Sequence, residues 1–207
     1  MNPEFLISAL VTLLVVVDPL GLVPIFASLT VRLPVAARRA VAVRASVIAF
    51  VILCGAALIG DWVLRQLGIG LPAFRIAGGL LLFSIASEMV FGVRIVRESQ
   101  SAEAAVDERV RNIAAFPLAI PLMAGPGAIT AVILLAGRTA GDPVRLGALI
   151  AVVAVVMLAC LVAFLLGTRL SRLLGITGNV VLERLLGVIL AALAVQFVID
   201  GVREIWS

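Results

Sequence analysis

Two short polar interruptions stand inside long apolar stretches of this sequence, and both contain residue types that could bind a small solute. The first reads DPLGLVP and runs from Asp18 to Pro24, and the second reads GPGA and begins at Gly125. Proline at the first position of a helix lacks the amide hydrogen that would be unpaired there, and aspartate caps such an end. The spacing therefore predicts that one helix ends and another begins at each interruption.

Helix ends inside a membrane are chemically useful because their backbone groups are unpaired. A half-helix that ends offers free carbonyls, which suit an ammonium group or a cation, and one that begins offers free amides, which suit a carboxylate. Two such breaks predict a site for a small zwitterion, or for a polar solute with a coupling ion. A plain proline kink in each span is the alternative. The predicted substrate-binding residues are Asp18, Pro19, Gly21, Pro24, Gly125, Pro126, Gly127 and Thr130.

Three polar side chains within the predicted spans have more than one possible role. Asp18 could couple a proton, pair with a substrate ammonium, or only cap the half-helix, since an acid at membrane depth is costly and usually functional. Thr130 could reach a ligand or bond back to the carbonyl four residues earlier. Glu88 could pair with an arginine such as Arg94, or it could take part in ion coupling.

The elements that position these residues are predicted to be transmembrane helices. Of 207 residues, 63% are apolar and 14% are charged, whereas about a quarter is charged in soluble domains. A helix needs about 20 apolar residues to cross the hydrocarbon core. We therefore predict an all-α integral membrane protein, a single domain over residues 1–207, with its first and fourth helices discontinuous. The six predicted spans are 5–30, 40–64, 73–93, 113–136, 144–168 and 180–202.

The two halves of the chain resemble each other. At one constant offset Pro19 falls on Pro126, and the ten residues from Gly60 align with those from Gly167; a small shift then aligns Arg75 with Arg184. We expect two units, residues 1–97 and 113–207, joined by a polar cytoplasmic loop at 98–112.

Each of these units has three predicted spans. The second unit must therefore cross in the opposite direction, which is the inverted repeat of many secondary transporters. Arg75 and Arg184 hold equivalent positions and are either interface anchors or gating residues.

The arginines predict the orientation. The chain contains no lysine, so all 16 basic residues are arginines and its formal net charge is +4. Eleven of them fall on the side of the loops after spans one, three and five, which should be cytoplasmic. Both termini should then face outward. The five arginines of the other side are Arg65, Arg75, Arg138, Arg145 and Arg203.

The motifs also resemble a known family. The segment DPLGLVPIF from Asp18, with Pro117-Leu118 and the segment AGPGAIT from Ala124, is similar to the MarC family of six-span inner-membrane proteins. Some members are described as neutral amino acid transporters, the SnatA type. The resemblance implies a multi-pass protein of the bacterial inner (plasma) membrane that moves a small neutral amino acid, such as glycine or alanine, with a proton or Na⁺ as the coupling ion.

The composition argues against several other classes of function. The chain has no histidine and no phosphate-binding loop signature, so we expect no enzyme activity, no cofactor and no metal site. We expect the arginines to set orientation in the lipid bilayer rather than to bind nucleic acid. Secondary transport by alternating access is the predicted function. A small-solute channel, or a membrane-embedded structural or regulatory subunit, is the alternative, and the oligomeric state is not predicted.

Overall fold

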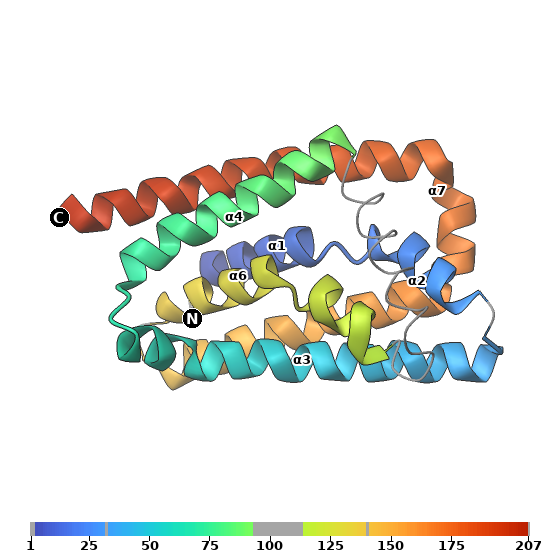
Figure 1. Cartoon of the computed structure of the whole chain (residues 1–207), viewed down its shortest axis with the longest axis horizontal. Coiled ribbons are helices and arrows are strands. Elements are labelled where there is room, and N and C mark those ends of the chain that lie inside the picture. Colours follow the sequence, from blue (N-terminus) through green and yellow to red (C-terminus); the bar gives the residue numbers. More distant parts are fainter. Residues whose placement is uncertain (1–2, 32, 93–113, 140, 207) are drawn as a thin grey trace.

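The computed structural model describes residues 3–31, 33–92, 114–139 and 141–206, and every regular element in those ranges is a helix (Figure 1). The predicted all-α fold is confirmed. The predicted cytoplasmic loop at 98–112 lies outside the described residues. The elements are α1 (Pro3–Val17), α2 (Leu22–Thr30), α3 (Val35–Gln66), α4 (Leu71–Phe91), η1 (Ala114–Met123), α6 (Pro126–Gly137) and α7 (Pro143–Trp206).

Most of these helices are long and apolar enough to cross a membrane. Among the described residues four stretches pass this test, namely α3, α4 and the two parts of α7 at Pro143–Leu166 and Val180–Trp206. The α1–α2 pair makes a fifth span if it is counted as one, with a bend of 43° at its break. An integral membrane protein is therefore confirmed, and the count of six spans stays a prediction.

The two predicted spans at 144–168 and 180–202 match the two membrane-spanning parts of α7. The backbone between these parts is also helical, so one helix runs from Pro143 to Trp206. The segment between them contains glycine but no proline, and a helix tolerates isolated glycines. Figure 1 shows that the first part of α7 and its C-terminal part run in opposite directions, so the chain reverses within continuous helix.

Glycines allow α4 and the C-terminal part of α7 to pack closely in antiparallel directions. A Cβ atom at Gly79 would lie 2.7 Å from the carbonyl oxygen of Ala194, and one at Gly201 would lie 2.9 Å from that of Pro72. Small residues serve this purpose between membrane helices, where close backbone approach increases van der Waals contact. An antiparallel pair is what inverted units would give for these segments, and the repeat itself stays a prediction.

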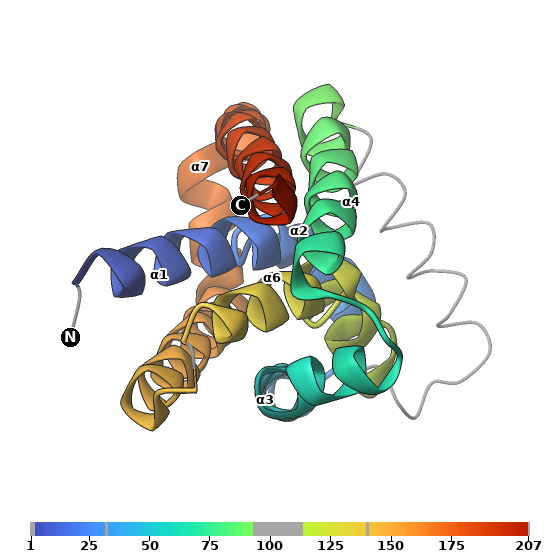
Figure 2. The same cartoon turned by 90° about the vertical axis from the view of Figure 1, so that its left-hand side faces the viewer.

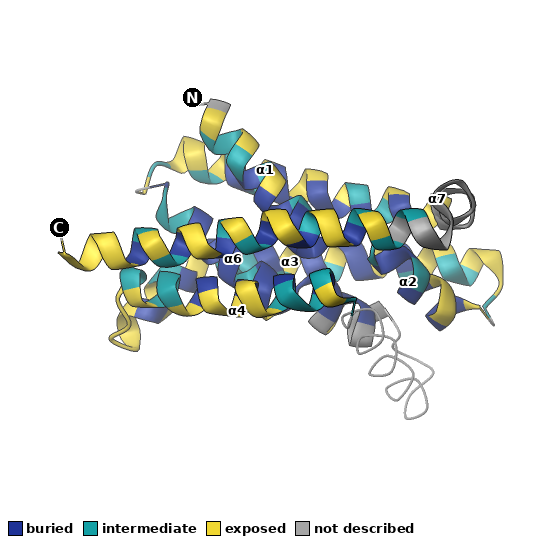
Figure 3. Cartoon of the chain, turned by 90° about the horizontal axis from the view of Figure 1, so that it is seen from above, coloured by how far each residue is buried: buried dark blue, intermediate teal, exposed yellow. Residues whose placement is uncertain are grey.

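Burial places α6 at the centre of the molecule. Ala131, Val132, Leu134 and Leu135 are fully buried, and α6 packs against α1, α3 and α4 (Figure 2). The outer helices instead expose large apolar side chains along much of their length (Figure 3). Extended apolar surface of this kind is expected where helices face lipid.

Candidate functional site

The first break is centred on Asp18. Helix α1 ends at Val17, and the Asp18 amide still donates to the Leu14 carbonyl at 2.9 Å. Asp18 then adopts a left-handed conformation with φ 51°, which aspartate tolerates better than most residues. This single residue redirects the chain into the turn from which α2 begins at Leu22. The predicted interruption of the first span is confirmed.

Asp18 also caps the helix that follows. Its Oδ1 accepts the Gly21 amide at 3.1 Å, and its carbonyl accepts the Leu22 amide at 3.2 Å. The Val23 amide donates to the Leu20 carbonyl at 3.2 Å. The first amides of α2 are therefore bonded within the break itself. The capping role of Asp18 is present, and its roles in proton coupling and ammonium binding stay predictions.

Gly21 makes room for the Asp18 carboxylate. Its backbone is ordinary right-handed helix, with φ −63°, so no positive φ requires glycine here. A Cβ atom at Gly21 would instead lie 2.8 Å from Cγ of Asp18 and would overlap its Oδ2. Asp18 is only 3% exposed. The glycine thus keeps a buried carboxylate against the backbone.

The second break begins with an unusual helix. η1 is a π-helix that contains Pro117 and Pro121, and its wide turn continues to Ala124, whose amide donates to the Ala119 carbonyl at 2.9 Å. Prolines remove two donors from any α-helical ladder, and π-turns are frequent at functional sites. Gly125 is then extended, with ψ 175°, before α6 begins at Pro126. The interruption of the fourth span is confirmed.

The start of α6 has no side-chain cap. Gly125 offers no side chain, and the Ile129 amide donates to the Gly125 carbonyl at 3.0 Å. The amides of Gly127 and Ala128 precede the first helical bond, so the helix itself provides them with no acceptor. Pro126 is exposed although its neighbours Gly125 and Gly127 are buried. The first amides of α6 therefore need an acceptor from outside the helix.

The two breaks adjoin each other. A Cβ atom at Gly127 would lie 3.6 Å from Cγ1 of Val16, in the last turn of α1, and 2.6 Å from Cδ1 of Ile85 in α4. In Figure 1, α1 and α6 lie side by side with the C-terminal end of α1 beside the N-terminal end of α6. A carbonyl end and an amide end therefore meet in the middle of the molecule.

The other predicted binding residues flank this junction. Pro19 is buried in the turn, and Pro24 is half-buried in the first turn of α2. Thr130 is 5% exposed, and its Cγ2 packs against the space that a side chain at Gly78 would occupy on α4. The predicted residues of both breaks are thus brought together, and their binding role stays a prediction.

The coupling and gating candidates lie in different places. Glu88 is half-buried in the last turn of α4, one turn beyond Ile85, and Arg94 lies outside the described residues. Arg184 is exposed on α7, with Nη2 4.0 Å from the Cβ position of Gly92 at the end of α4. Arg75 lies at the opposite end of α4, so the structure does not bring these two arginines together.

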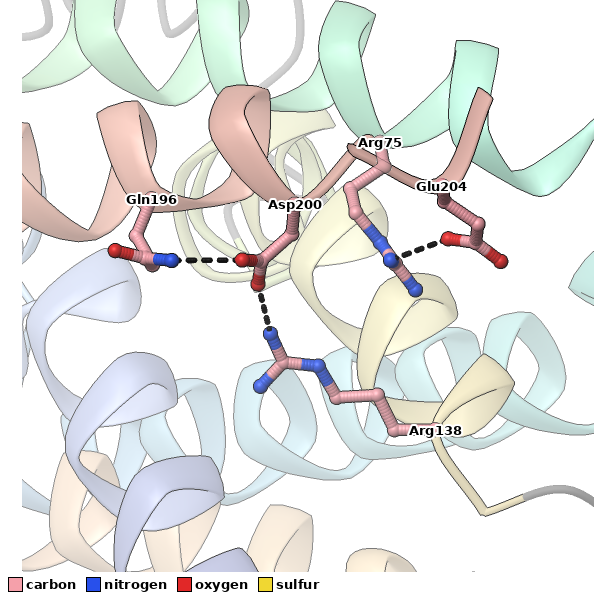
Figure 4. Close-up of polar contacts among 5 residues, drawn as sticks. All are labelled: Arg75, Arg138, Gln196, Asp200 and Glu204. Atoms are coloured by element: carbon pink, nitrogen blue, oxygen red, sulfur yellow. Dashed lines mark hydrogen bonds and ion pairs between the residues drawn. The ribbon is translucent and has the colours of Figure 1, made fainter. Parts of the chain in front are cut away.

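An ion-paired cluster at the Arg75 end was not predicted (Figure 4). Arg138, at the end of α6, donates to Asp200 of α7 at 3.0 Å, and Gln196 donates to the other oxygen of Asp200 at 2.7 Å. Arg75 of α4 pairs with Glu204 of α7. The Asp200–Glu204 spacing of four residues on one helix face was the signal in the sequence. The cluster ties α4, α6 and α7 together at one end.

Comparisons with known proteins agree on one family. The sequence model described as MarC family integral membrane protein matches residues 3–206. A UPF0056 membrane protein of Aquifex aeolicus is 38% identical over 202 residues, which cover 96% of this chain and 92% of that protein. The UPF0056 membrane protein YhcE of Escherichia coli is 35% identical over 195 residues, covering 94% and 90%. No solved structure matches the chain.

Proposed function

We propose that this chain, which belongs to the MarC family of integral membrane proteins, is a secondary transporter. Its substrates would be small neutral amino acids such as glycine or alanine. Transport would proceed by alternating access and would be coupled to a proton or Na⁺ gradient. The protein would lie in the inner membrane with both termini outside, because the arginine-rich end would then be cytoplasmic.

The single observation that carries this proposal is the junction of the two breaks. The contact between Val16 and the Gly127 position sets the carbonyl end of α1 beside the uncapped amide end of α6. An ammonium group suits the first end and a carboxylate suits the second. A small zwitterion satisfies both ends at once, and an amino acid with a short neutral side chain is the simplest such molecule.

The difference between the breaks supports a division of roles. The carbonyls of Asp18 and Leu20 already accept the first amides of α2, so the substrate carboxylate would bind at Gly127 and Ala128 rather than at α2. The buried Asp18 carboxyl group lies in the break itself, where a carboxylate would attract a cation. That cation would be the substrate ammonium or the coupling ion.

The ion-paired cluster supports alternating access. Arg138–Asp200 and Arg75–Glu204 hold α4, α6 and α7 together at the end where the chain's α1 begins and α7 finishes. The side chains of Arg138 and Asp200 are 33% and 26% exposed, whereas those of Arg75 and Glu204 are 12% and 43% exposed. Ion pairs that keep some contact with water contribute less stability than fully buried pairs, which suits contacts that must open and close. In this proposal Arg75 is a gating residue.

Uptake into proteoliposomes tests the function. Purified protein would be reconstituted, and the initial uptake of radiolabelled glycine and alanine measured with an imposed proton or Na⁺ gradient. We expect saturable uptake that falls when the gradient is dissipated. Flux that does not saturate and ignores the gradient would instead indicate a channel. No flux of any of the twenty amino acids would contradict the proposal and favour a structural or regulatory subunit.

A further inference from the structure

A cavity of about 240 Å³ lies along α2, between Val23 in its first turn and Val35 at the start of α3. One face of α2 forms its wall, through Val23, Phe26 and Thr30, which recur at helical spacing. Phe164 of α7 also lines the cavity, and its ring stacks on Phe26 at 4.6 Å between centroids, so the two rings belong to one wall. Arg39 of α3 lies at the outer rim. We call this space the α2 cavity.

The residues that line the α2 cavity come from two chemically different places. Its inner end is at Val23, whose amide bonds to Leu20 within the first break. Its outer end is at the first turn of α3, on the arginine-rich side of the molecule. At the other end of the molecule the Arg138–Asp200 pair joins α6 to α7. The α2 cavity therefore lies at the end of the molecule opposite to the ion-paired cluster.

The two arginines of the α2 cavity have different roles. Arg38 donates to the carbonyls of Val31 and Leu33 at 2.8 and 3.0 Å, so it stabilises the turn between α2 and α3. Arg39 is exposed, and within the described part of the chain it forms no ion pair. Arg39 is therefore the positive charge that a ligand in the cavity can reach.

Thr30 complements this charge. Its hydroxyl donates its one hydrogen to the Phe26 carbonyl at 2.7 Å, so towards a ligand Oγ1 can act only as an acceptor. A guanidinium at the rim and an acceptor in the wall match a carboxylate and an ammonium. The volume is also below the range of about 300–1,000 Å³ that is usual for drug-sized ligands.

We propose that the α2 cavity is the access site at which an amino acid zwitterion first binds, with its carboxylate on Arg39 and its ammonium on Thr30. This inference rests on the proposed transport function, and it adds the side of arrival and the residues of first contact.

The test compares Arg39→Gln with Arg44→Gln. Arg44 is an exposed arginine of the same helix, and it lies outside the lining of the α2 cavity, so it is a matched control for charge. We expect Arg39→Gln to raise KM for alanine about three-fold with kcat unchanged, the effect of one partly solvated ion pair. Arg44→Gln should leave both values as in the wild type.

Two further measurements separate the possible outcomes. Alanine should raise the Tm of the wild type more than that of Arg39→Gln, whereas alaninamide, which has no carboxylate, should not distinguish them. Equal KM and equal Tm shifts for the two variants would overturn this inference while leaving transport by the wild type intact. An Arg39→Gln effect confined to vesicles with anionic lipid would overturn it in favour of a lipid headgroup. Absence of wild-type uptake would overturn both proposals.

Discussion

The two breaks interrupt a membrane span and start a new helix in different ways. At the first break Asp18 turns the chain through a left-handed residue and its carboxylate bonds the Gly21 amide. At the second break an extended Gly125 and a proline start α6 without any side-chain cap. One break carries a buried carboxyl group that accepts a backbone amide, and the other has neither an acidic side chain nor a side-chain cap.

This difference indicates that the breaks are not interchangeable. A break that only bends a span needs no charge, because proline and glycine suffice, as Gly125 and Pro126 show. The carboxylate at Asp18 is therefore an addition to the bend, and it is costly at membrane depth. We infer that the first break determines ion or ammonium binding and the second determines carboxylate binding.

Asp18→Asn should have the largest effect on transport. Asparagine tolerates the left-handed conformation and retains an oxygen for the Gly21 amide, so the fold should persist. Loss of the charge should remove the partner of the bound cation. Since losing one member of a buried pair costs about 3–5 kcal/mol, we expect initial alanine uptake to fall about 100-fold or more.

The control for this variant is Asp61→Asn. Asp61 is an acid of α3 whose side chain is 44% exposed and pairs with Arg65 at 2.9 Å. Alanine uptake by Asp61→Asn should match that of the wild type. Normal uptake by Asp18→Asn would mean that the carboxylate serves only as a cap, and the proposed difference between the breaks would be lost.

Gly127→Leu should give the next largest loss of uptake, through the second break. Even a Cβ atom at this position meets Ile85 at 2.6 Å, so the larger side chain must separate the first turn of α6 from α4 and α1. Overpacking of this kind costs about 1–3 kcal/mol, which a detergent-solubilised thermal melt would detect.

Gly127→Ala provides the milder comparison for this site. It adds one carbon against the flexible ends of Ile85 and Leu82, so it should remain folded with reduced uptake. Full uptake by both variants would exclude the amide end of α6 from substrate binding.

Gly21→Ala tests the first break through stability. The added methyl overlaps the Asp18 carboxylate, so we expect a loss of about 1–3 kcal/mol in unfolding free energy. The same change in an Asp18→Gly background should cost at least about 1 kcal/mol less, because contacting residues are coupled. Additive effects in this double-mutant cycle would show that Gly21 does not serve the carboxylate.

Thr130→Val should have the smallest effect. Valine keeps a methyl group for the contact with Gly78 and removes only the hydroxyl. If that hydroxyl contacts substrate, KM for alanine should rise by about one hydrogen bond's net value, 0.5–1.5 kcal/mol or roughly 2- to 12-fold. An unchanged KM would remove Thr130 from the binding residues. The backbone amides of α6 would then be the proposed substrate contacts at the second break.

Local chemistry explains why both breaks could be predicted from the sequence. Proline and aspartate act on their own neighbours, so Asp18 and Pro126 mark a helix start wherever the chain folds. The continuous backbone of α7 could not be predicted in this way. An apolar pattern predicts which residues lie in lipid and which lie in water. The polar residues near 168–180 can lie outside the lipid while their backbone remains helical.

Contacts between distant residues also escaped prediction. Arg138 and Asp200 are 62 residues apart, and Arg75 and Glu204 are 129 apart, so their pairing depends on how α4, α6 and α7 pack. The role of Gly21 was hidden for a related reason. The sequence indicates a residue without a side chain, but only the position of the Asp18 carboxylate shows what fills the space.

A structure of the purified protein with saturating alanine would test the zwitterion site most directly. The substrate carboxylate should lie about 3 Å from the amide nitrogens of Gly127 and Ala128, the distance of a hydrogen bond, with the ammonium facing the end of α1 and Asp18. Alanine bound away from both breaks, or a bound state in which spans one and four are continuous helices, would contradict the proposed site.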